Sequence, residues 1–544
     1  MSDLNLQALA GHGNVETKAP TAMQEVNLAL KACGFGLFHI QLMFTSFVGF
    51  VAGIMVTNST PYILPIAECD LDMNLLQKGV LNAMPFVGMV SVCVVAGFLT
   101  DTFGRKIFLV GGYGGLFVFT FIGGISQTYL VLVTAKLFEG MLFAASFNAV
   151  VTLTSEFCHN GIRDRMMLLQ SSFAGFGQVI AALMSWAILT QKWKDSYFNG
   201  AIVLNTWNFY LIIMSMWSLL ASCLYMLLPE SPKYFITQKR YDEARKILIN
   251  IYTRNTGKTA DSFPYPNLWK DKMKQIDESP ELCNQHFGNM LSVGLHNIKP
   301  MFRRPLGIYL ILFCFMMFFS MILYNVIRLW FPQLSTIAEY YSTPENQNLC
   351  VMLDAYTSDL RSRKFNVTNS SDVCIPAVSG TETYLNSVIL GSICVVPFII
   401  SGILVSRVGK KYLYIVCGLI TVGATLGLRW ASSKIEMVAL FSTDVAIAQT
   451  MNSLNQALVI EHFPTTTRSL AIAVLMTCGR TGSLVGNILF PILLDKGCVV
   501  PFYTLAGSMI CIVSKQMDRP AKSLTDTKSI LFAVSLNDKE KLLC

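Results

Sequence analysis

Charged residues are scarce in this sequence. Of its 544 residues only 14% are Asp, Glu, Lys or Arg, whereas 53% are hydrophobic. Soluble domains usually carry about 25% charged residues, so the composition excludes a string of ordinary soluble domains, which the length alone would suggest. The net charge of +8 is no evidence for a nucleic-acid partner, because the basic residues follow the pattern of membrane orientation described below.

The motifs of common enzyme classes are also missing. The 15 cysteines include no C-x-x-C pair and no Cys/His cluster at zinc spacing. There is no Walker, Rossmann, zinc-protease or catalytic-triad arrangement, and the glycine run at 111–115 lies inside an apolar segment without the Lys-Ser/Thr ending of a phosphate loop. We therefore expect no enzyme activity, no metal site and no cofactor. The first residues show no cleavable signal pattern.

Long apolar runs are what the sequence contains instead. A helix needs roughly 18 or more apolar residues to cross the hydrocarbon core, and about twelve runs approach or exceed that length. They lie near 36–58, 79–100, 107–125, 129–153, 167–190, 205–228, 306–330, 383–405, 412–430, 436–460, 470–494 and 498–514. These runs predict an all-α membrane protein with 12 transmembrane helices in two six-helix bundles.

The expected organisation has five parts. The bundles cover residues 35–228 and 305–514, and a polar helical linker at 229–304 joins them. Polar tails at 1–34 and 515–544 flank the bundles.

Two charged landmarks recur in the sequence at one offset. The decapeptide Gly97–Lys106 has a counterpart, Gly402–Lys411, 305 positions later, and both lie between apolar runs. A Glu followed seven residues later by an Arg recurs at the same offset, as Glu156 with Arg163 and Glu461 with Arg468. We interpret these repeats as a membrane half that is duplicated in parallel.

Lysine and arginine in the short loops set the orientation, because such loops stay cytoplasmic. The basic loops and the basic linker at 229–304 fall on one side, which places both termini in the cytoplasm. Residues 331–382 then face the lumen or the cell exterior. This loop holds the glycosylation sequons of Asn366 and Asn369 and two cysteines, Cys350 and Cys374, which we predict to form a disulfide in an oxidising compartment.

Ionisable residues inside a membrane are costly and are functional candidates by default. Asp444 is the clearest, as a cavity residue or as a structural hydrogen-bond partner, and Arg480 is the second. Lys136 and Glu139 share a helix face and are predicted to form a structural pair. Arg328 is predicted to lie near the luminal end of its helix and to reach water. Four polar residues could line a midplane cavity or serve in packing, namely Asn148, Gln178, Asn325 and Asn452.

Several motifs resemble those of known transporters. Gly97-x-Leu99-x-Asp101-x-x-Gly104-Arg105-Lys106 resembles the signature loop of the major facilitator superfamily. The Pro229-Glu230-Ser231-Pro232 and Glu461–Arg468 stretches resemble elements of its sugar-porter and organic-ion branches. Leu64–Asp70, Ser155-Glu156-Phe157 and Asn255–Lys258 resemble the synaptic vesicle glycoprotein-2 subgroup and its insect-type relatives.

The resemblance implies a cytoplasmic charge network that holds the outward-open state. Its members would be Asp101, Arg105, Glu156, Arg163, Glu230, Glu461 and Arg468. The sequence departs from the subgroup in its first helix, where Gly53-Ile54-Met55-Val56 replaces an Asp-Gly-x-Glu stretch. This departure argues against proton coupling through that helix.

The sequence as a whole predicts a secondary transporter that moves a small organic solute by alternating access, with or without a coupling ion. It would work as a monomer in the plasma membrane or an intracellular vesicle membrane. Asp444 would suit a cationic solute, whereas Lys136 and Arg480 would suit an anion, so the charge of the solute stays open. The alternative is a membrane protein of transporter ancestry that acts in binding or trafficking without transport.

Overall fold

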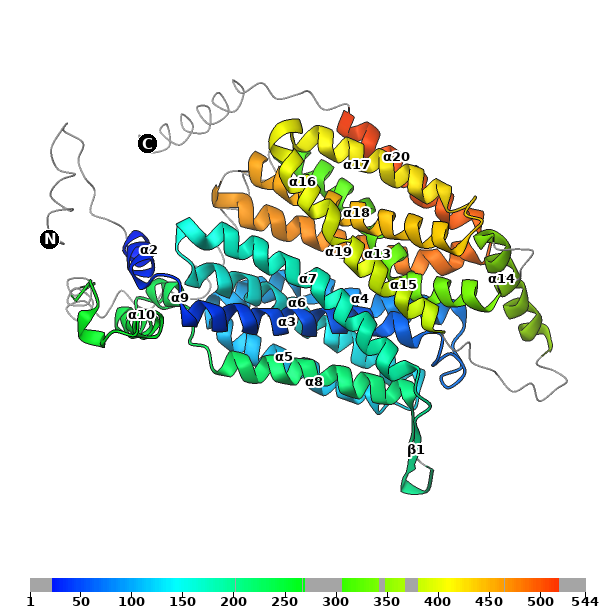
Figure 1. Cartoon of the computed structure of the whole chain (residues 1–544), viewed down its shortest axis with the longest axis horizontal. Coiled ribbons are helices and arrows are strands. Elements are labelled where there is room, and N and C mark those ends of the chain that lie inside the picture. The colour runs from blue at the N-terminus through cyan, green and yellow to red at the C-terminus, as the bar shows by residue number, and fades with distance from the viewer. Residues whose placement is uncertain are drawn as a thin grey trace, which may run out of the picture.

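The computed structural model describes residues 22–200, 202–266, 268–269, 306–341, 348–366, 380–463 and 465–517. Helices dominate these ranges, and the strands within them form a single antiparallel hairpin, β1 (Lys194–Tyr197) and β2 (Ile202–Asn205), that encloses the short turn η1 (Phe198–Gly200). The hairpin projects from one end of a bundle of long helices (Figure 1).

The first half of the bundle contains six long helices. They are α3 (Leu37–Ile63), α4 (Leu75–Phe103), α5 (Arg105–Gly124), α6 (Tyr129–Phe157), α7 (Asn160–Leu189) and α8 (Thr206–Met226). The second half repeats this pattern with α13 (Leu306–Tyr340), α15 (Thr381–Ile393) followed by α16 (Val395–Val408), α17 (Lys410–Gly427), α18 (Lys434–His462), α19 (Thr465–Leu494) and α20 (Val499–Met517). Figure 1 shows the two halves side by side with their long helices roughly parallel. The expected twelve crossings are therefore present, if α15 and α16 count as one.

By length and composition alone, eight of the described helices could each cross a membrane. The eighth crossing is divided, because α15 ends at Ile393 and α16 begins at Val395. Pro397 explains the break, since it has no N–H to donate to the carbonyl of Ile393 and its ring crowds that carbonyl.

The duplicated register is preserved over four crossings. Helices α6 and α18 both have 29 residues, and α7 and α19 both have 30. Each pair begins 305 positions apart. The turn before α5 contains Gly104 at φ 97° and ψ 158°, and the turn before α17 contains Gly409 at φ 84° and ψ 149°. Only glycine adopts this conformation without strain, which explains why both decapeptides keep it.

The same ion pair also recurs in the two halves. Arg105 Nη2 lies 2.9 Å from Glu156 Oε1, and Lys410 Nζ lies 3.0 Å from Glu461 Oε2. Each pair ties the turn after the second crossing of its half to the end of the fourth. The repeat therefore extends from sequence to side-chain geometry.

The small helices distinguish the two ends of the bundle. Helices α2 (Ala22–Cys33), α9 (Pro232–Thr237) and α10 (Tyr241–Thr256) lie at one end, which we call the linker end, and η2 (Ala260–Ser262) follows α10. Helix α14 (Leu349–Asn366) and the β hairpin lie at the opposite end, which we call the loop end (Figure 1). The described parts of the 229–304 and 331–382 segments thus lie at opposite ends of the bundle.

Helix α2 corrects one sequence-based expectation. Residues 22–33 were expected to belong to a polar tail, but they form a helix that packs against α9 and α10. Its buried residues are Val26, Ala29, Leu30 and Cys33, a spacing that places them on one helical face. The Cys33 thiol also donates to the Leu248 carbonyl of α10 at 3.5 Å.

The predicted Cys350–Cys374 disulfide is wrong. Cys350 is bonded to Cys498, with the two Cα atoms 5.2 Å apart. Helix α14 folds back onto the turn before α20, where the Cys498 N–H donates to Asp354 Oδ1 at 2.9 Å. Cys69 is disulfide-bonded as well. Cys350 and Cys374 were paired because they lie in the same predicted loop. The fold of α14 instead brings Cys350 next to Cys498.

The two remaining predictions for this loop concern glycosylation. Asn366 is the last residue of α14, and its side chain is outside the described residues. Asn369, like Cys374, lies wholly outside them. Glycosylation of Asn366 and Asn369 therefore stays a prediction.

Replacing Cys498 with Ser should free the Cys350 thiol. We expect Cys350 to become alkylated without prior reduction, and we expect the free energy of unfolding to fall by about 2–4 kcal/mol because a long loop is released. Mass spectrometry of peptides from the unreduced protein measures the first effect. Cys223→Ser, at an exposed free cysteine, is the control. A peptide that links Cys350 to Cys374 in the unreduced wild-type protein would contradict the structure.

Candidate functional site

The two halves meet along three helix pairs, α4 with α19, α7 with α15, and α3 with α13. The close contacts cluster toward the loop end, where α4 begins and α19 ends. A Cβ atom placed on Gly79 would lie 2.6 Å from Pro491 Cγ, and one on Gly391 would lie 3.2 Å from a Val179 methyl carbon. The Tyr62 and Tyr384 rings stack across the interface with their centroids 6.2 Å apart. The halves are therefore in tight contact at the loop end.

A buried lysine strengthens the loop-end contact. Lys78 of α4 has no exposed surface, and its Nζ lies 2.7 Å from Glu68 Oε2. The same nitrogen donates to the Tyr356 hydroxyl of α14 at 3.3 Å. Since α14 is tied to the second half by the Cys350–Cys498 disulfide, Lys78 connects the two halves.

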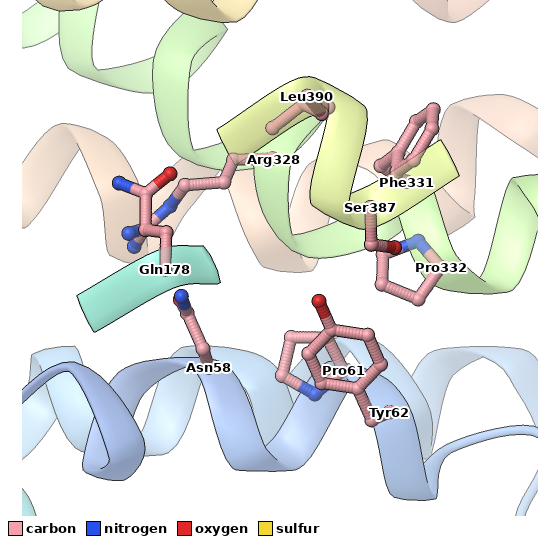
Figure 2. A pocket seen from close by; sticks show the side chains of 9 residues that line it. All are labelled: Asn58, Pro61, Tyr62, Gln178, Arg328, Phe331, Pro332, Ser387 and Leu390. Carbon is pink, nitrogen blue, oxygen red and sulfur yellow. The ribbon is translucent and has the colours of Figure 1, made fainter. Parts of the chain in front are cut away.

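A small pocket lies between the halves, next to this contact. Figure 2 shows the residues that line it, which come from α3 (Asn58, Pro61 and Tyr62), α7 (Gln178), α13 (Arg328, Phe331 and Pro332) and α15 (Ser387 and Leu390). The free space at its centre is about 20 Å³, enough for one water molecule. The pocket is therefore lined by both polar and apolar side chains, shared by both halves and very small in this conformation.

Arg328 is the charged residue of the pocket. Its Nη2 donates to Asn325 Oδ1 at 3.1 Å, and its guanidinium carbon lies 5.0 Å from the centre of the Tyr324 ring. The Tyr324 hydroxyl in turn accepts from Gln178 Nε2 of α7 at 3.4 Å. Among the described residues, no carboxylate pairs with Arg328. In Figure 2 the guanidinium lies beside the Gln178 amide.

The position of Arg328 corrects a sequence-based expectation. The seventh crossing was expected to end near residue 330, which would place Arg328 at the membrane surface. Helix α13 instead continues to Tyr340, so Arg328 lies well inside the helix. The signal was present in the sequence, because Leu334, Ile337 and Ala338 continue the buried face beyond the arginine.

Arg480 of α19 is the second arginine between the halves. It is 9% exposed, and its Nη1 contacts Cys93 Sγ of α4 at 2.9 Å. No carboxylate among the described residues pairs with it either. Of the predicted cavity residues, Arg480 and Gln178 therefore lie at the interface between the halves.

Other predicted cavity residues connect helices within the second half. Asn325 donates to Ser483 Oγ of α19 at 2.7 Å, and Asn452 accepts from Ser320 Oγ of α13 at 2.6 Å. Asn148 lies on α6, half-buried and outside the set of pocket-lining residues.

Asp444 is buried but turned away from the pocket. Its Oδ2 accepts from Thr425 Oγ1 of α17 at 3.0 Å, and it is absent from the pocket lining. The equivalent position in the first half is Glu139, which pairs with Lys136 Nζ at 2.9 Å. Lys136 corresponds to Phe441 in the second half. The buried acid therefore has a lysine partner in the first half and lacks one in the second. The Lys136–Glu139 pair matches the predicted structural pair.

The described members of the predicted charge network lie at the linker end. Glu230 accepts the backbone N–H groups of Arg105, Lys106 and Ser231 at 3.2, 2.9 and 2.9 Å. A carboxylate at the N-terminus of α5 is favourable because the helix dipole is positive there. The Arg105 guanidinium, which pairs with Glu156, also lies 5.5 Å from the centre of the Tyr234 ring.

These contacts join groups within one half, as does the pairing of Glu461 with Lys410. Arg163 is exposed and takes part in further interactions. The side chains of Asp101 and Arg468 are outside the described residues. Burial lowers the pKa of Lys233 on α9, although the nearby Glu156 carboxylate opposes this shift.

Comparison with known proteins gives two family matches. Residues 39–327 match the model of the "Sugar (and other) transporter" family, and residues 376–526 match that of the major facilitator superfamily. Rat (Rattus norvegicus) synaptic vesicle glycoprotein 2A is 26% identical over 332 residues, which cover 57% of this chain and 43% of the relative. Rat synaptic vesicle glycoprotein 2B is 24% identical over 223 residues, or 41% of this chain and 33% of the relative. The chain thus matches less than half the length of these relatives.

Solved structures share the fold. The xylose transporter XylE from E. coli, in a partially occluded inward-open conformation, superposes with a TM-score of 0.60 at 15% identity, over 89% of this chain and 100% of that one. The nucleoside transporter NupG superposes with a TM-score of 0.57 at 12% identity, over 88% and 99%. The fold, the family matches and the apolar helices agree that this is a multi-pass integral membrane protein. The chain belongs to the sugar (and other) transporter family of the major facilitator superfamily.

Proposed function

We propose that the protein is a secondary transporter that moves a small organic solute by alternating access. The observation that carries this proposal is the pocket lined by helices of both halves, closed toward the loop end by Gly79, Tyr62 and Lys78. A solute held between two rigid halves can be released to either side if the halves rock about it. This conformation would release solute toward the linker end.

The linker-end ion pairs fit the rocking motion. Arg105 with Glu156, and Lys410 with Glu461, each hold the turn between two crossings of one half. Closure of the linker end would bring these turns together, so we propose that the predicted network of charges forms across the halves only in that state. The basic residues of the linker end favour a cytoplasmic location under the positive-inside rule, and the described conformation would then be inward-facing.

A coupling ion, if there is one, would bind outside the centre of α3. The space beside Gly53 is filled by Phe143, because a Cβ at Gly53 would lie only 2.6 Å from Phe143 Cε2. An acidic side chain does not fit there without rearrangement. This packing also favours the second candidate, a binding or trafficking protein that has lost transport.

Solute uptake distinguishes the two candidates. Purified protein in liposomes should accumulate at least one solute from a broad mixture of metabolites, with saturable kinetics, and mass spectrometry of the vesicle contents would identify it. Liposomes without protein are the control. Failure to accumulate any solute, from a preparation that is folded and correctly inserted, would support the binding or trafficking role and overturn the transport proposal.

Gly79→Val should disturb the loop-end contact. The added side chain would collide with Pro491 and the Asn487 carbonyl, and overpacking of this kind costs roughly 1–3 kcal/mol. Such a cost shifts a two-state equilibrium by roughly fivefold to a hundredfold. We expect Ser387→Cys to react about tenfold faster with a membrane-impermeant maleimide applied at the loop end when Gly79→Val is present, and we expect uptake to fall.

The matched control for this prediction is Gly111→Val. A Cβ at Gly111 of α5 meets no atom within 4 Å, so this variant adds the same side chain without a collision. Equal labelling of Ser387→Cys in the Gly79→Val and Gly111→Val backgrounds would contradict the proposed gate.

A further inference from the structure

The charges inside the described helix bundle do not cancel at the interface between the halves. The Lys136 ammonium is neutralised by Glu139, and that of Lys78 by Glu68. Asp444 faces Thr425 of α17 instead of the pocket. Arg328 and Arg480 are left without a carboxylate partner in the described part of the chain.

An uncompensated guanidinium inside a membrane protein is costly. Complete removal of an ion from water costs several kcal/mol even after the protein relaxes, and the half-buried Arg328 bears part of that cost. The Tyr324 ring and the side-chain Oδ1 of Asn325 offset part of this cost for Arg328, but the Arg328 Nε has no acceptor. A bound anion would supply the missing charge and the missing acceptor together.

The neighbours of Arg328 suit the same type of ligand. Gln178 and Asn58 carry amide groups, and the Tyr62 and Ser387 hydroxyls point into the same space (Figure 2). Asn58 is 8% exposed, and it is the Nδ2 group of its amide that could donate to an anion. Amides and hydroxyls can donate to the oxygens of a carboxylate while the planar guanidinium binds two of its lone pairs.

Arg480 extends the positive charge toward the linker end. Asn325 and Ser483 are hydrogen-bonded and therefore lie at one depth. Arg328 follows Asn325 by three residues, and Arg480 precedes Ser483 by three, on helices that both run from the linker end to the loop end. At 1.5 Å rise per residue, the two arginines are offset by roughly 9 Å along the axis. The second arginine thus lies along the route on which a solute would leave.

We propose that the solute is a small organic anion whose acidic group binds Arg328 in the pocket, with Arg480 next along the route to the linker end. That the bound anion is a transported solute rests on the proposed transport function. The anion site itself can be tested by binding alone. The proposal also assigns Arg328, which sequence analysis placed at the membrane surface, to the centre of recognition.

Binding can be measured with probes that share a carbon skeleton and carry a negative, a neutral or a positive group. One set is glucuronate, glucose and glucosamine, and the other is 3-phenylpropanoate, 3-phenylpropanol and 3-phenylpropylamine. At least one of the two anions should raise the melting temperature of the purified wild-type protein, while its neutral and cationic counterparts should not. If neither anion binds, or if a neutral or cationic probe binds as well as its anion, the inference is wrong.

Variants of Arg328 assign the site. Arg328→Gln should weaken binding of the anion by about tenfold or more, because a charge-assisted hydrogen bond is lost. Arg328→Lys should retain part of the affinity, and it keeps the test meaningful if Arg328→Gln does not fold. Arg254→Gln, at an exposed arginine of α10, is the control. Unchanged affinity in both Arg328 variants would overturn the assignment.

The uptake experiment separates this inference from the transport proposal. Accumulation of anionic solutes, reduced in Arg328→Gln, supports both. Accumulation of neutral or cationic solutes independent of Arg328 overturns the anion site and leaves transport intact. Binding of an anion through Arg328 without any uptake overturns transport and leaves the anion site intact.

Discussion

A charge buried inside a membrane protein has to be compensated, and this requirement organises the helix bundle. Lys136 and Glu139 neutralise each other within the first half, and Lys78 and Glu68 do so at the loop end. Among the described residues, the Thr425 hydroxyl is the one hydrogen-bond partner of the Asp444 carboxyl group. Arg328 and Arg480, which face the first half, are the exception. A ligand that binds and dissociates would best supply the negative charge that they lack.

The two halves share a skeleton but differ in chemistry. Over four crossings the helix ends, the glycine turns and the linker-end ion pairs recur at one offset. The buried acid recurs as Glu139 and Asp444, but the central basic residues do not, since Lys136 corresponds to Phe441 and Arg480 has Gly175 at its place in the first half. Neutral polar groups of the first half, such as Gln178 and Asn58, thus face a basic surface of the second. A duplicated scaffold has diverged where the solute would bind.

The architecture was predictable from sequence, but part of the candidate site was not. Apolar runs locate a crossing because the bilayer imposes its length, and the repeated decapeptide gives the register of the halves. Neither fixes which way a side chain faces. Asp444 was expected to be a cavity residue or a structural one, and only its orientation toward α17 separates these. Arg328 was predicted too close to the membrane surface, because the apolar run was taken to end near the charged residue. Cys350 was assigned the wrong disulfide partner, because its true partner lies 148 residues away in the sequence.

The central claim is that contact at the loop end and contact at the linker end exclude each other. Spin labels report this directly, with one pair at Leu76 and Ile492 near the loop end and another at Phe103 and Val408 near the linker end, all at exposed positions. Distances measured by double electron–electron resonance in lipid nanodiscs should change in opposite directions when Gly79→Val is introduced, with the loop-end distance rising and the linker-end distance falling. A change at one end alone, or at neither, would contradict alternating access about the shared pocket.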